Sequence, residues 1–106
     1  KAEAHNKLGN QAEALRLLNI IRTRATLPNL TLATATSLYG DLEGAILHER
    51  FVELSYEGHR WFDLVRTGKA ISTMQPINGL SDEANLVWPI HEDALNNPNL
   101  TQNSFY

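Results

Sequence analysis

The sequence predicts an all-α fold, with helices over residues 1–74 and a long irregular segment over residues 75–106. Apolar residues recur at helical spacing in two long segments, and glycines stand where helices would end. Prolines and an Asn-Gly pair interrupt the chain after residue 75. These patterns divide the chain into a helical hairpin (1–26), a connector (27–40), further helices (41–74) and a loop-rich tail (75–106). We expect all four to form one part of a larger single domain.

The first segment predicts an αα-hairpin. Ala2–Leu8 forms a short helix that Gly9 ends as the residue after its C-cap. Asn10 and Glu13 have the spacing of a capping box, in which each side chain bonds the other residue's backbone N–H. The amphipathic helix Gln11–Ala25 follows, and the short turn folds it back on the first helix.

The next stretch, Thr26–Thr36, reads as a connector. Pro28 cannot continue a helix, and the β-branched threonines disfavour one. We expect a helix to resume between Ser37 and Leu42, with Ser37 and Asp41 as alternative N-caps.

A longer helix is predicted over Leu42–Tyr56, before Gly58 interrupts it. It carries two apolar stripes, which predicts that it is buried between neighbours. The first stripe contains Leu42, Ala45, Ile46, Val52 and Tyr56, and the second contains Leu47, Phe51 and Leu54.

Shorter elements complete the expected fold. Arg60–Arg66 predicts a helix that Gly68 ends, and Lys69–Met74 predicts another short helix. In the tail, Leu86–Trp88 is the one strand-like run, and His91–Leu95 could form one helical turn.

Composition excludes several classes of function. The net charge is −3, from 9 Lys and Arg against 12 Asp and Glu, which argues against a nucleic-acid surface. No apolar run approaches the roughly 20 residues of a membrane-spanning helix. There is no cysteine, and the four histidines do not recur at a metal-ligand spacing, so we expect neither a metal nor another cofactor. The chain begins within a predicted helix and without Met, so we expect it to belong to a longer protein.

Two sets of residues could carry chemistry. Glu49 and Glu53 share a helix face, as a pair of glycosidase carboxylates could, but neighbouring arginines favour a network of ion pairs instead. Trp61 and Trp88 could stack on sugar rings, as could Phe62, although core packing is the expectation for all three.

A long pattern in the middle of the chain resembles the signature of the SusD/RagB family. Residues 46–54 (ILHERFVEL) and 57–68 (EGHRWFDLVRTG) are similar to its I-x-x-E-R-x-x-E-L-x-x-E-G-x-R-x-x-D-L-x-R-x-G. WPI (88–90) and NPNLTQN (97–103) resemble the family's closing motif, and residues 12–25 resemble its last TPR-like helix. The resemblance covers most of the chain and is weakest over residues 27–40 and 75–85.

The resemblance implies a TPR-like αα-hairpin and a surface lipoprotein of the Bacteroidetes outer membrane, with its N-terminal lipid anchor outside this chain. Such a protein binds oligosaccharide or polysaccharide for nutrient uptake without cleaving it, and its partner is a TonB-dependent, SusC-like transporter. The signature residues would then be a structural framework, and the sugar contacts would lie mainly upstream. The framework comprises Glu49, Arg50, Glu53, Glu57, Gly58, Arg60, Asp63, Arg66 and Gly68.

We expect Glu53–Arg60 and Glu49–Arg66 to be ion pairs within this framework. Two other functions stay open. One is a TPR-like scaffold with a protein ligand, and the other is a glycoside hydrolase that uses Glu49 and Glu53.

Overall fold

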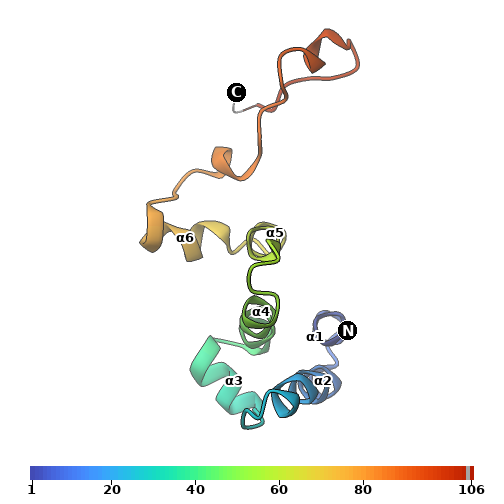
Figure 1. The fold of residues 1–106 in the computed structure, drawn as a ribbon, viewed down its shortest axis with the longest axis vertical. Helices are drawn as coiled ribbons and strands as arrows, with labels where there is room; N and C mark the ends of the chain where they lie inside the picture. The colour runs from blue at the N-terminus through green and yellow to red at the C-terminus, as the bar shows by residue number, and fades with distance from the viewer. Residues whose placement is uncertain (105) are drawn as a thin grey trace. The chain divides into compact units, whose positions relative to one another are not determined.

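A computed structural model describes residues 1–104 and 106 of the chain. It confirms the all-α class, because the described residues form six α-helices and two short 3-10 turns and contain no strand (Figure 1). The chain divides into two compact units, Lys1–Arg60 and Trp61–Tyr106. The helices are α1 (Ala2–Lys7), α2 (Gln11–Arg24), α3 (Leu32–Tyr39), α4 (Leu42–Glu53), α5 (His59–Arg66) and α6 (Ala70–Asn78).

The first two helices form the expected hairpin. Gly9 has φ +79°, and the backbone N–H of Asn10 donates to the carbonyl of His5, which is the bonding of a Schellman motif. The Asn10 side chain accepts from the backbone N–H of Glu13 at 3.3 Å, so this half of the predicted capping box is confirmed. The Glu13 carboxylate turns instead to Arg16, at 2.7 Å, and this hydrogen bond lowers the pKa of Glu13.

The expected connector contains a helix, α3, that begins at Leu32 and not within the predicted window of 37–42. A reciprocal capping box between Thr31 and Thr34 starts it, which offsets the low helix propensity of threonine. The turn before it is fixed by Asn19, whose side-chain amide both donates to and accepts from the backbone of Leu30. Asp41, one of the two candidate N-caps, caps α4 by accepting from the backbone N–H of Gly44.

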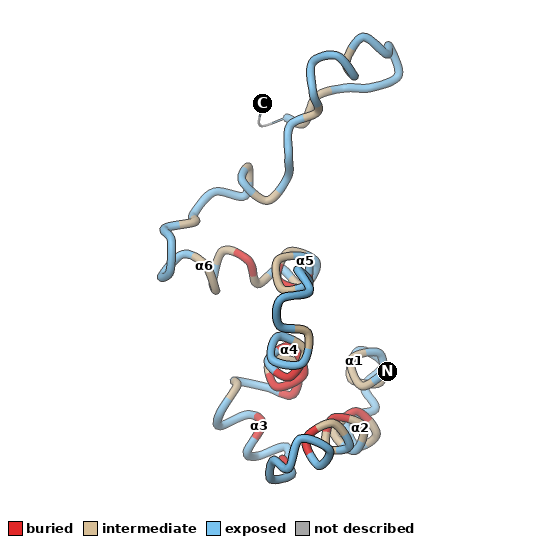
Figure 2. The backbone as a smooth tube through the Cα atoms, in the orientation of Figure 1, coloured by how far each residue is buried: buried red, intermediate tan, exposed pale blue. Residues whose placement is uncertain are grey.

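The core of the first unit lies between α2, α3 and α4, and Figure 2 shows its buried residues gathered mainly on α2 and α4. It consists of Ala14, Leu18, Leu30, Ala35, Leu42, Ala45 and Ile46. Lys7 ties α1 to α4 through a 2.6 Å ion pair with Glu43, and this hydrogen bond raises the pKa of Lys7.

The prediction that the two apolar stripes are buried between neighbours was wrong for the last turns of α4. Leu42, Ala45, Ile46 and Leu47 are buried, as predicted. The rest of both stripes is more open, and Leu54 is half-buried. Phe51, Val52 and Tyr56 are exposed.

Gly68, which has φ +68°, follows the end of α5 and terminates that helix as predicted. The next helix, α6, continues through Pro76 to Asn78, beyond its predicted end at Met74. The run Leu86–Trp88 forms no strand. The tail is closed by side chains that bond the backbone: the Gln102 amide pairs with both backbone groups of Ile90 at 2.9 Å, and Asn103 donates to the Trp88 carbonyl. The helical turn predicted over His91–Leu95 is present with 3-10 bonding, because the backbone N–H groups of Ala94 and Leu95 donate to the carbonyls of His91 and Glu92, and it continues into the 3-10 turn Ala94–Asn96.

Candidate functional site

The most buried charged group of α4 is Glu49, which is 8% exposed. Its carboxylate accepts a hydrogen bond from the guanidinium of Arg22 on α2, which is 6% exposed. Arg22 also donates through Nε to the carbonyl of Pro28 at 2.9 Å. One arginine therefore joins α2, the turn that follows it and α4, and each buried charge has its partner.

Arg22 was not predicted as the partner of Glu49, for which Arg66 was expected. The usable signal is that Arg22 stands four residues after the buried Leu18, a spacing that places both on one helix face. A buried acid on α4 then requires a cation from a neighbouring element, and Arg22 supplies it.

The expected Glu53–Arg60 pair is wrong. Glu53 pairs with Arg24 of α2 on an exposed surface. Arg60 donates to the carbonyl of Leu47 at 3.3 Å, and its guanidinium lies 4.9 Å from the centre of the Phe51 ring. Arg60 therefore holds the turn after α4 against the side of that helix through a backbone bond and a cation–π contact.

The second unit has its own pair, between Arg66 and the buried Asp63, at 2.7 Å. Arg66 thus pairs with a neighbour three residues away on α5, where a pair with Glu49 was expected. The carbonyl of Asp63 also accepts from the hydroxyl of Thr67, which completes the end of the helix before Gly68.

Tyr56, within the signature, has φ +69° and a fully exposed side chain. The left-handed conformation costs a tyrosine about 1–2 kcal/mol, whereas asparagine tolerates it. Tyr56→Asn is therefore expected to stabilise the protein by about 0.5–1 kcal/mol in urea unfolding. Tyr56→Phe keeps the strain and should leave stability unchanged, so an equal gain from both variants would contradict this explanation.

The aromatic candidates differ in exposure. Trp61 is half-buried in α5, but Phe62 is 70% and Trp88 84% exposed, so the expectation of core packing was wrong for these two. Phe62 lies two residues from the buried Leu64, and residues at that spacing do not share a helix face. Trp88 lies in an irregular segment that holds its backbone and leaves its ring accessible.

The histidine side chains of the described residues do not gather into a metal site. His48 stacks on Tyr39 with ring centres 4.9 Å apart, and His59 lies 3.8 Å from Glu57. Within residues 1–104 and 106, no three His, Asp or Glu side chains lie close enough to hold a metal ion. The helices in this described part of the chain are also too short or too polar to cross a membrane.

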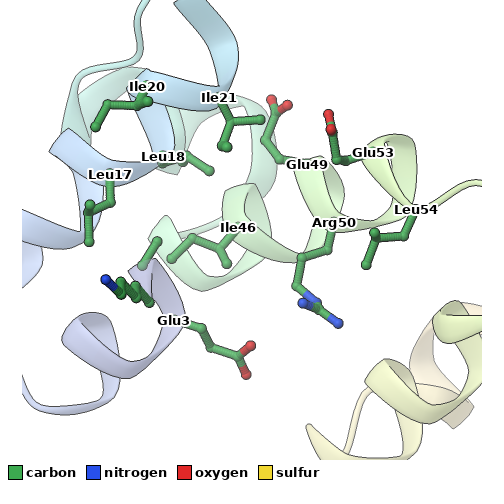
Figure 3. Close-up of a pocket in the computed structure, with 12 residues that line it drawn as sticks. Glu3, Leu17, Leu18, Ile20, Ile21, Ile46, Glu49, Arg50, Glu53 and Leu54 are labelled. Atoms are coloured by element: carbon green, nitrogen blue, oxygen red, sulfur yellow. The ribbon is translucent and has the colours of Figure 1, made fainter. Parts of the chain in front are cut away.

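The first unit contains a groove between α1, α2 and α4, with a volume of about 390 Å³ (Figure 3). We call it the α1–α2–α4 groove. In Figure 3, Leu17 and Leu18 of α2 and Ile46 of α4 line the space between the helices, and Glu3 and Arg50 lie at its lower edge. Its lining is Lys1, Ala2, Glu3, Leu17, Leu18, Ile20, Ile21, Ile46, Glu49, Arg50, Glu53 and Leu54.

The comparisons with known proteins agree with the signature. A model of the SusD family matches residues 1–106. A curated SusD-like protein of Formosa agariphila is 44% identical over 112 aligned residues, which cover 100% of this chain and 22% of that protein. The chain therefore spans about a fifth of the length of this relative, and no solved structure matches it. With the family model matched from end to end, the chain belongs to the SusD family.

Proposed function

We propose that the protein to which this chain belongs captures glycan at the outer membrane of a Bacteroidetes cell and does not cleave it. It is a lipid-anchored surface protein, and it passes oligosaccharide or polysaccharide to a TonB-dependent, SusC-like transporter. The observation that carries this proposal is the match of the SusD family model across all 106 residues.

Within that protein, we propose that residues 41–74 are structural framework. The contacts of the signature side chains support this role, because these side chains bind other groups of the chain itself. Arg22 binds Glu49, Arg60 binds the backbone of α4, and Arg66 binds Asp63. The exposed Trp88 presents a ring that a sugar could reach, and it stays a candidate for contact with ligand.

The geometry gives little support to a glycoside hydrolase built on Glu49 and Glu53. Two acids of such an enzyme must both reach one glycosidic bond. Glu49 is buried against Arg22, and Glu53 is occupied by Arg24. A protein-binding scaffold remains the second alternative, and it would retain a protein and no saccharide.

Affinity electrophoresis of the full-length protein against a panel of polysaccharides tests the proposal. We expect at least one polysaccharide to retard the protein, with no reducing sugar released on prolonged incubation. Release of reducing sugar that is lost in Glu53→Gln would establish the hydrolase instead. Absence of both retardation and release across the panel would favour the protein-binding scaffold.

The framework role makes a separate prediction for Arg60. Arg60→Ala removes the bond to the Leu47 carbonyl and the contact with Phe51, which together are worth about 1–2 kcal/mol. The melting temperature should fall by several degrees, while retardation by the bound polysaccharide stays unchanged. Arg16→Ala, which removes an exposed ion pair on α2, is the control and should change the melting temperature less. A variant of Arg60 that kept its fold but lost affinity would place this residue in the binding site.

A further inference from the structure

The α1–α2–α4 groove has the lining of a helix-binding surface. On α2 its apolar residues are Leu17, Leu18, Ile20 and Ile21, and three of them, Leu17, Ile20 and Ile21, recur at i, i+3 and i+4. Along α4 and its C-cap, the lining residues Ile46, Arg50 and Leu54 recur every four residues. Rows of this kind form the ridges and grooves through which α-helices pack, so a further helix can lay an apolar row in the groove beside α1.

The chemistry of the groove disfavours a sugar. None of its lining residues is aromatic, so it offers no ring for a pyranose to stack on. Of its three acids, Glu49 and Glu53 are already paired with Arg22 and Arg24, and Glu3 also has a partner, so they demand no cation from an occupant. The groove leaves apolar surface exposed to solvent, because Ile20 is 51% exposed and Leu17, Ile21 and Leu54 are half-buried.

We propose that this groove binds an amphipathic helix from the part of the same SusD-like protein that lies outside these 106 residues. The length of the relative supports this occupant, because 22% of that protein accounts for the whole of this chain. A segment of the same protein also has a higher effective concentration than any separate partner.

The proposal does not depend on the glycan ligand, and cysteine labelling can test it. The chain has no cysteine, so one introduced into it can be followed by mass spectrometry of its own peptide. Ile20→Cys places a thiol in the groove, and Leu8→Cys places one on a residue that is 83% exposed and outside the groove lining. Both variants would be made in the full-length protein and treated with a maleimide, natively and in urea.

We expect Ile20→Cys to react at least tenfold more slowly in the native protein than in urea, and Leu8→Cys to show a much smaller difference. Equal native rates for the two variants would overturn the proposal. Protection of Ile20→Cys that disappears on dilution would assign the groove to a second copy, and protection that appears only with polysaccharide would assign it to the ligand. Hydroxyl-radical footprinting of Ile20 and Leu8 in the unsubstituted protein gives the same comparison without any risk of misfolding.

Discussion

Replacing Glu49 with alanine is expected to destabilise the protein by about 3–5 kcal/mol, because it leaves the guanidinium of Arg22 buried without its counter-charge. Arg22 is 6% exposed, so water cannot replace the lost carboxylate at little cost. Its bond to the Pro28 carbonyl would survive, but that neutral group cannot balance the charge. Urea unfolding of the full-length protein, followed by helical circular dichroism, measures the loss.

Glu53→Ala is the matched control. Glu53 lies four residues further along α4 and also pairs with an arginine of α2, but its side chain is 44% exposed. Exposed pairs contribute roughly 0.2–1 kcal/mol, so this variant should lose no more than that. Equal losses for the two variants would show that burial does not distinguish the pairs.

A double replacement separates the charge from the packing. The double variant Arg22→Met/Glu49→Leu removes both charges together and replaces them with apolar side chains of similar size. Exchanges of this kind are often close to neutral, because no charge is left buried. The double variant is therefore expected to be more stable than Glu49→Ala. If it is no more stable, the loss in Glu49→Ala comes from the missing side-chain volume.

The ends of most helices could be predicted because they depend on residues a few positions apart. Gly9, Gly68 and Asn10 act locally, and each was found in its predicted role. The all-α class follows from apolar spacing within single helices. The start of α3 was missed because a capping box of two threonines outweighed their low helix propensity.

The ion pairs could not be predicted in the same way. Glu49 and Arg22 are 27 residues apart, and Glu53 and Arg24 are 29 apart, so the packing of α2 against α4 selects the partners. The presence of arginines beside acids predicted a charged network but not its connections. The groove was missed for the same reason, since its walls come from three separate helices.

Gly44→Ala is expected to destabilise the protein by about 1–3 kcal/mol, although alanine is the better helix former by about 1 kcal/mol. Gly44 lies in the first turn of α4, and a Cβ built on it would come less than 3.0 Å from the carbonyl oxygen of Tyr39. Backbone cannot move aside as the end of a flexible side chain can. The last residue of α3 and the first turn of α4 would therefore have to separate.

That separation would also disturb the N-cap, because the backbone N–H of Gly44 is the donor to the Asp41 side chain. Ala12→Gly, in the exposed first turn of α2, measures propensity without a steric conflict and should cost about 1 kcal/mol. If propensity alone governed residue 44, alanine there would stabilise the protein by a similar amount. The sign of the change in melting temperature therefore decides whether the close approach of α3 and α4 requires a glycine.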